Sequence, residues 1–160
     1  MKSLFRVVLP AIFFIFFTSV SAAKLGSWPP NVYGPYILGN IEVLNAATLS
    51  AQIFVWPDFS PHYKIRLQGV VVPGANSDDL CEQVLAASGV LSVKGRLMGS
   101  PAIMLTDVRG HNDAGQVVGN ILYIDKDGTV ANLANVLVKH KLARLSSASN
   151  SDGPWCGKRR

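Results

Sequence analysis

The segment 63–73 constrains this chain more than any other part of its sequence. It reads Tyr-Lys-Ile-Arg-Leu-Gln-Gly-Val-Val-Val-Pro, an apolar run that enters a proline turn, as a β-strand and the turn that ends it do. The strand carries a single arginine, Arg66, and the whole segment contains no carboxylate. We therefore expect a strand with a cation that has no acidic partner within its own segment.

Patterning on both sides of this segment predicts a small β-rich domain. Residues 36–44 and 48–55 are predicted strands joined by a turn, and the second of them alternates apolar with polar side chains. With 63–72 they form a predicted meander of three strands. Two further strands are expected at 101–108 and 116–124, the second after a polar loop.

Two helices are predicted from side chains that recur at helical spacing. The first covers about 79–88, with Ser77 or Asp78 as its N-cap, and rests on Leu80, Val84, Ala87 and Leu91. Glycines at 89 and 95 predict that residues 90–99 are irregular or extended. The second helix follows a turn that ends in a left-handed Gly128, and one of its faces carries Leu133, Val136, Leu137 and His140.

The first 22 residues have the features of a secretory signal peptide. Lys2 and Arg6 precede an apolar run at 7–17, and small residues then form a cleavage site that we place after Ala22. The alternative is an uncleaved membrane anchor, but the run is well short of the about 20 residues that span a bilayer. We expect a secreted or periplasmic protein without a stable membrane anchor after cleavage.

Export affects how the two cysteines and the charge are interpreted. In an oxidising compartment Cys81 and Cys156 can form a disulfide, and the alternative is a pair of free thiols. Loss of Lys2 and Arg6 lowers the formal net charge from +5 to +3, and part of the remainder lies in the basic end at 158–160. This charge gives a mild bias towards anionic partners.

Several segments in chain order together resemble one known family. They are the strand at 63–73 with its proline turn, then 115–121, then Asp127-Gly128, then 137–143. Together they resemble the staphylococcal nuclease-like, or thermonuclease-like, family over residues 36–144. The resemblance implies a β-rich α+β fold, a five-stranded Greek-key barrel of the OB type with two packed helices.

The resemblance also sets the expected organisation of the chain. After the signal peptide at 1–22 we expect an irregular lead-in at 23–35 and the OB-fold domain at 36–145. A polar and basic tail follows at 146–160.

The activity that the resemblance implies is calcium-dependent cleavage of phosphodiesters in DNA or RNA. Such chemistry uses carboxylates to hold the cation and to place the attacking water, and two arginines to stabilise the charge on phosphorus. In this chain Ala47, Val71 and Gly74 occupy the carboxylate positions, and Gln116 replaces the second arginine. Because only Arg66 is retained, we expect no catalysis by this mechanism, no bound calcium and no other cofactor.

Arg66 and Gln116 remain as candidates for contacting an anion. Arg66 has a second, purely structural interpretation, in which Asp58, Asp107 or a backbone carbonyl holds it. We predict an exported noncatalytic module that binds nucleic acid or another polyanion. The alternatives are an exported protein-interaction domain and a calcium-dependent phosphodiesterase with an unorthodox site.

A relocated site is one way to realise that last alternative. Four polar residues alternate at the end of the fourth predicted strand and in the loop after it, so an extended backbone would point them in one direction: Asp107, Arg109, His111 and Asp113. Such a cluster can bind a metal or activate water. The other interpretation, an exposed loop with soluble side chains, is the one we favour.

Overall fold

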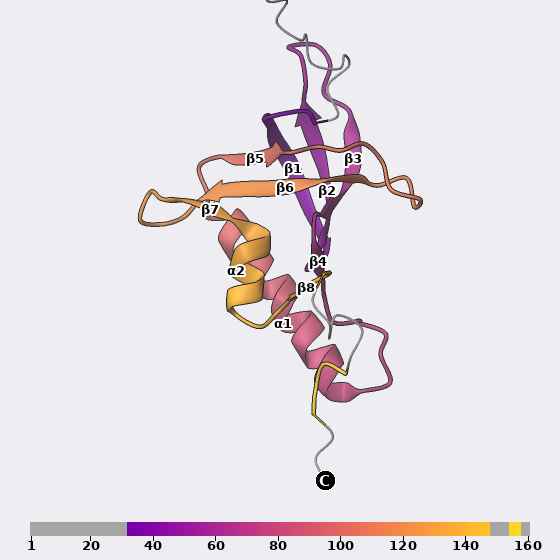
Figure 1. Ribbon diagram of the computed structural model, residues 1–160. Helices are drawn as coiled ribbons and strands as arrows, with labels where there is room; N and C mark the ends of the chain where they lie inside the picture. The colour runs from indigo at the N-terminus through magenta and orange to yellow at the C-terminus, as the bar shows by residue number, and fades with distance from the viewer. Residues whose placement is uncertain (1–31, 148–153, 158–160) are drawn as a thin grey trace, which may run out of the picture.

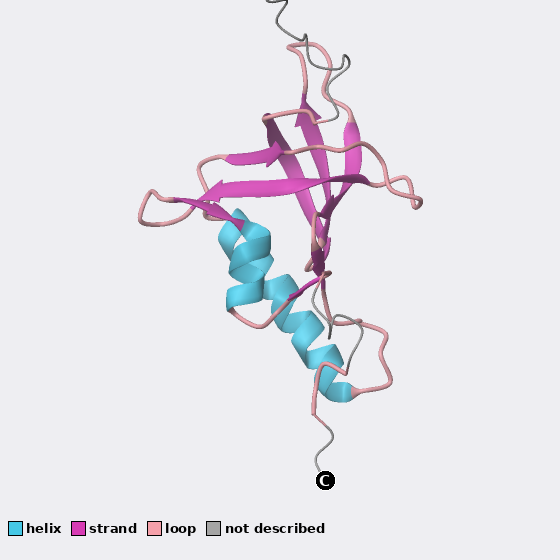
Figure 2. Cartoon of the chain, in the orientation of Figure 1, coloured by secondary structure: helices cyan, strands magenta, loops and turns pink. Residues whose placement is uncertain are grey.

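The computed structural model describes residues 32–147 and 154–157, so the predicted signal peptide lies outside the described residues. Five strands close into a barrel (Figures 1 and 2): β1 (Tyr36–Asn45), β2 (Thr48–Phe54), β3 (His62–Leu67), β5 (Ile103–Thr106) and β6 (Val117–Ile124). They lie in the order β3-β2-β1-β5-β6 with antiparallel neighbours, and a parallel pairing of β3 with β6 closes the ring. This mixed five-stranded barrel with two helices confirms the predicted OB-type fold class.

Strand alternation places the core inside the barrel. On β2 the side chains of Leu49, Ala51 and Ile53 are buried, and on β3 those of Ile65 and Leu67 are buried. Because successive side chains of a strand point to opposite faces, the residues between them lie on the outer surface. The core is therefore set by the same period-two pattern that predicts the strands.

Two helices lie together at one end of the barrel, α1 (Leu80–Leu97) and α2 (Leu133–Lys139) (Figure 1). The chain places α1 between β4 and β5, and α2 after β7. Neither helix of the described chain combines the length and the apolar run needed to cross a membrane. Three short strands complete the fold: β4 (Val70–Val71), β7 (Val130–Asn132) and β8 (Arg144–Leu145).

Helix α1 is longer than its sequence suggests, and the expectation of irregular structure at 90–99 is wrong. The helix continues to Leu97 because Gly89 is a packing position: a Cβ built on it would lie 2.8 Å from the Cβ of Ala46. The missing side chain lets the helix approach the β1–β2 turn closely. The N-cap is Asp79, one or two residues later than expected, and its carboxylate accepts a hydrogen bond from the Cys81 N–H at 2.9 Å.

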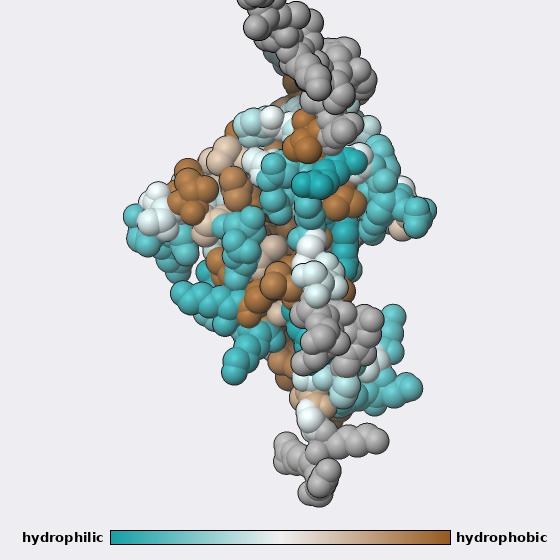
Figure 3. Space-filling view, viewed as in Figure 1, coloured by the Kyte–Doolittle hydropathy of each residue, from teal (hydrophilic) through white to brown (hydrophobic). Residues whose placement is uncertain are grey.

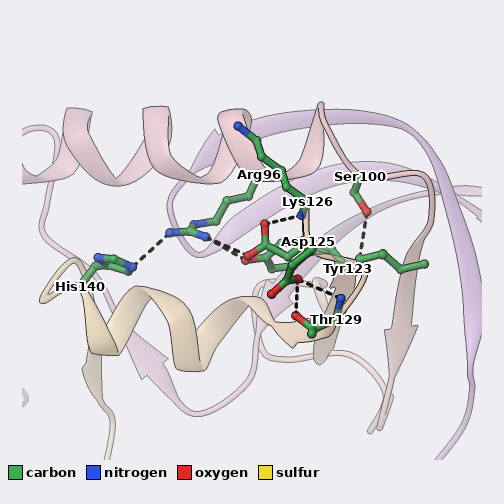
Figure 4. A network of polar contacts seen from close by, with 9 residues as sticks. Arg96, Ser100, Tyr123, Asp125, Lys126, Thr129 and His140 are labelled. Atoms are coloured by element: carbon green, nitrogen blue, oxygen red, sulfur yellow. Dashed lines mark hydrogen bonds and ion pairs between the residues drawn. The ribbon is translucent and has the colours of Figure 1, made fainter.

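Arg96 connects α1 to the barrel and to the end of α2 (Figure 4). Its Nη1 donates to the hydroxyl of the buried Tyr123 at 3.1 Å and lies 3.8 Å from the carboxylate of Asp125. Its Nη2 lies 3.2 Å from Nε2 of His140, which follows α2. One guanidinium thus joins three elements that are far apart in the sequence.

The C-terminal segment is attached to the start of α1 by the predicted disulfide between Cys81 and Cys156, whose Cα atoms are 6.3 Å apart. The guanidinium of Arg144 lies 4.2 Å above the ring of Trp155 and donates to the carbonyl of Pro154 at 2.8 Å. Arg144 belongs to β8, which pairs with β4. The disulfide and Arg144 therefore hold residues 154–157 beside the start of α1 and β8.

Candidate functional site

The positions at which the resembled family has carboxylates have structural roles in this protein. Ala47 is fully buried in the core, and Val71 pairs with Arg144 in the short β4–β8 ladder. Gly74 is exposed, and its N–H donates to a carboxylate oxygen of Glu82 at 2.8 Å. The second oxygen of Glu82 accepts from the Ser77 hydroxyl at 2.7 Å, so this carboxylate stabilises the loop before α1.

Arg66 projects from the outer side of β3, between the inward-facing Ile65 and Leu67. Its Nη2 donates to the carbonyl of Val70 at 3.2 Å, and its Nη1 lies 3.4 Å from the hydroxyl of Thr48. Of the structural interpretations, the backbone carbonyl is therefore the one observed. No carboxylate of residues 32–147 or 154–157 forms an ion pair with this guanidinium.

The surroundings of Arg66 make its positive charge less favourable but supply no negative charge to balance it. Partial burial lowers the pKa of Arg66 from its ordinary value, because the charged form loses solvation. A guanidinium nevertheless stays protonated at neutral pH. Arg66 is thus a half-buried cation whose two protein partners are both neutral oxygen atoms.

Gln116, the other candidate anion contact, is bonded to its own loop. Its Oε1 accepts from Nδ2 of Asn112 at 2.9 Å, and its backbone N–H donates to Oδ1 of the same residue at 2.8 Å. The β3–β6 pairing sets Arg66 opposite Val118, two residues after Gln116. The two candidates are therefore neighbours along the barrel, but no hydrogen bond joins their side chains in the described chain.

The structure adds two basic residues beside Arg66 that the sequence argument missed. His62, Lys64 and Arg66 occupy alternate positions of β3 and point outwards as a row, since the residues between them face the core. The register of β2 with β3 sets Gln52 opposite His62 and Ser50 opposite Lys64. We call the outward residues of these two strands the β2–β3 face: Ser50, Gln52, Phe54, His62, Lys64 and Arg66. Part of the signal was present in the sequence, as Lys64 and Arg66 at alternate positions of the strand predicted at 63–72; His62 directly precedes that segment.

Exposed aromatic side chains extend this face into the β2–β3 hairpin, which projects from the end of the barrel away from the helices (Figure 1). Trp56 is 74% exposed and Phe59 is 58% exposed, and mutual backbone hydrogen bonds of 3.2 and 3.0 Å hold the two residues opposite each other. Phe54 lies over Gly39, where an added Cβ would approach its ring to 2.7 Å. The turn thus presents large rings to solvent on a fixed backbone.

The relocated cluster expected as one alternative does not assemble. Asp107 has a left-handed φ of 52° and accepts a hydrogen bond from Nδ2 of Asn120 at 2.8 Å. The His111 ring instead contacts Tyr63, with the ring centres 5.7 Å apart. Within the described part of the chain, no three histidine, cysteine or acidic side chains come together as potential metal ligands.

The fold and this face define the class of the protein as an OB-type β-barrel with a basic and aromatic outer surface. The chain matches no model of a known protein family, and no curated protein is significantly similar to it. The resemblance to the staphylococcal nuclease-like family therefore stays a prediction that rests on the residues quoted above.

Proposed function

We propose that this protein is a noncatalytic, nucleic-acid-binding OB-fold module that acts outside the cytoplasm. The binding surface is the β2–β3 face together with the aromatic hairpin beyond it. The observation that carries the proposal is the outward row of His62, Lys64 and Arg66, in which Arg66 is half-buried and has only neutral partners.

Phosphate fits this row for electrostatic reasons. A partly desolvated cation without a counter-ion is unfavourable, and a bound anion supplies the missing charge through charge-assisted hydrogen bonds. Lys64 is exposed and lies about 7 Å along the strand from Arg66, at the spacing of alternate residues. The acidic residue closest to Lys64 in the strand pairing is Glu42, on the far side of Ser50, and no ion pair links the two charges.

The exposed rings favour a single strand over a duplex. Bases of a single strand are free to stack on aromatic side chains, and each such contact contributes about 1–3 kcal/mol. Trp56 and Phe59 lie in the turn between β2 and β3, and β3 carries the basic row. A backbone lying along β3 can therefore bring its bases to the hairpin while its phosphates remain near Lys64 and Arg66.

The proposal includes binding without cleavage and a location in an oxidising compartment. Ala47, Val71 and Gly74 provide no metal ligand at the positions where the resembled nucleases have carboxylates. The disulfide between Cys81 and Cys156 suits a compartment outside the cytoplasm, in agreement with the predicted signal peptide.

The test is the salt dependence of binding to a fluorescent oligothymidylate of about 20 nucleotides, measured by anisotropy. Each phosphate contact to a single strand contributes about −0.7 to the slope of log K against log salt, so two contacts give about −1.4. Between about 50 and 200 mM salt the affinity should fall about sevenfold for the wild type. With one contact left in Lys64→Ala, it should fall about threefold.

Matched variants distinguish binding at this surface from a general effect of the protein's positive charge. Lys139→Ala removes a cation that is also exposed, from α2, and should leave the slope unchanged. Trp56→Ala should weaken binding without changing the slope, because it removes stacking and no charge. Equal effects of Lys64→Ala and Lys139→Ala would refute the site, and calcium-dependent cleavage that is lost in Arg66→Ala would refute the noncatalytic assignment.

A further inference from the structure

Part of β1 lacks a strand partner on one of its two sides. Strand β1 runs from Tyr36 to Asn45 and pairs with β2 along most of its length. On its other side β5 pairs only with Tyr36 and Ile37. The backbone from Gly39 to Val43 therefore has a sheet neighbour on one side and none on the other among the described strands.

A cleft runs along this free edge, between β1 and the last turn of α1. Its volume is about 510 Å³, within the range of binding clefts in proteins. Consecutive β1 residues from Leu38 to Val43 form one wall, and Lys94, Leu97 and Met98 form the other. Ile103, the first residue of β5, closes one end. Figure 3 shows apolar surface where the strands meet the helices.

The shape and chemistry of the cleft indicate the kind of occupant. Six strand residues span about 20 Å, which is the length of a short extended peptide. The lining is mostly aliphatic, and its two charges, Glu42 on the strand and Lys94 on the helix, are of opposite sign, so the cleft has no net charge. Met98 is 86% exposed at the rim, and its flexible thioether can adapt to different side chains.

A β-bulge near Asn40, at the N-terminal part of the free edge, limits indiscriminate pairing of β1 with other strands. The β1–β2 register shifts between Gly39 and Glu42, and Asn40 there has a left-handed φ of 46°. Bulges of this kind discourage edge-to-edge association of sheets. After the left-handed Asn40, β1 continues from Ile41 to Val43 beside the helix, and this is the part that can pair.

We propose that this cleft binds an extended peptide segment of a partner protein, which adds to β1 as a strand and continues the line of β5. The peptide is recognised by backbone hydrogen bonds to the β1 edge and by aliphatic side chains at alternate positions, which enter the cleft towards Leu97 and Met98. The peptide uses the edge of β1 that faces away from β2, whereas the proposed nucleic-acid surface is formed by side chains of β2 and β3.

In the test, a library of displayed random heptapeptides is selected for binding to the purified protein. Peptides that also bind the Met98→Lys variant are removed by counter-selection. Enriched peptides should alternate aliphatic with other residues. When they are added to the isotopically labelled protein, the amide signals of residues 38–43 and 94–98 should shift. Met98→Lys should weaken binding at least fivefold, while Val84→Lys, the same change at an exposed apolar position of α1 outside the cleft, should leave it unaltered.

N-methylation of the selected peptide at the amides facing β1 provides the control for strand addition. It should abolish binding, because it removes the backbone donors and keeps the side chains. The proposal is overturned if no peptide is enriched over the Met98→Lys counter-selection, or if the N-methylated peptide binds equally well. It is also overturned if the edge amides are already protected from hydrogen exchange in the protein alone, either as a monomer or through concentration-dependent dimerisation.

Discussion

Two glycines in α1 give opposite predictions for the same substitution. Both are helical, so replacement by alanine gains about 1 kcal/mol from helix propensity. At Gly95 a new Cβ meets nothing within 4 Å, and the gain should be realised in full. At Gly89 the new Cβ would lie 2.8 Å from Ala46, and overpacking of this kind costs about 1–3 kcal/mol.

The expected free energies of unfolding therefore differ by about 1–3 kcal/mol between the two variants, with Gly95→Ala the more stable. Gly95→Ala should unfold at higher urea concentration than the wild type, and Gly89→Ala at a lower one. Urea denaturation followed by circular dichroism measures both, provided that the slopes of the transitions agree. If Gly89→Ala stabilises the protein as much as Gly95→Ala, then α1 does not pack on the β1–β2 turn, and the close approach that we describe is incorrect.

Two further predictions concern the tail and the loop before α1. Cys156→Ser should lower the melting temperature markedly, because opening a loop of 75 residues removes about 4 kcal/mol by the chain-entropy estimate, and a reductant should then cause no further change. The pKa of Glu82 is lowered chiefly by hydrogen bonds from the Gly74 N–H and the Ser77 hydroxyl, so its stabilising effect is present above the ordinary carboxyl pKa and is lost as the pH falls through the lowered value. Glu82→Gln should therefore reduce the melting temperature at pH 7 and make little difference in strong acid, and an equal loss at both pH values would contradict this role.

The barrel strands and the approximate start of α1 could be predicted because their signals are local. Alternation in 48–55 follows from burial of every second side chain, and the strand is observed at Thr48–Phe54. The left-handed turn residue Gly128 is likewise observed, with a φ of 82°. By contrast, β4, β7 and β8 have two or three residues each, too few for any period to appear.

The end of α1 could not be predicted for a different reason. Glycine disfavours a helix in isolation, and only the contact of Gly89 with Ala46, 43 residues earlier in the chain, makes it an advantage. The same holds for the partners of Arg66. Sequence offered two aspartates and a carbonyl as alternatives, and the turn after β3 brings the Val70 carbonyl to the guanidinium.

The candidate site was likewise predictable from the sequence only in part. The loss of carboxylates at 47, 71 and 74 is visible in the residues themselves, given the family resemblance. Lys64 and Arg66 alternate in the sequence, but only the observed start of β3 at His62 places all three basic side chains in one outward row. The cleft beside β1 could not be predicted from the sequence, since it arises where the pairing of β5 with β1 ends after Tyr36 and Ile37.

By itself, the sequence determined where the five barrel strands lie, which of their side chains face inwards, and that two cysteines were available to form a disulfide. These properties depend on neighbouring residues, whose alternation records the two faces of each strand. Only the tertiary structure decided that β3 closes the barrel against β6, that Gly89 lets α1 approach the β1–β2 turn closely, and that part of β1 keeps a free edge. Such contacts join residues far apart in the chain, and they are fixed by the packing of the whole core rather than by any local pattern.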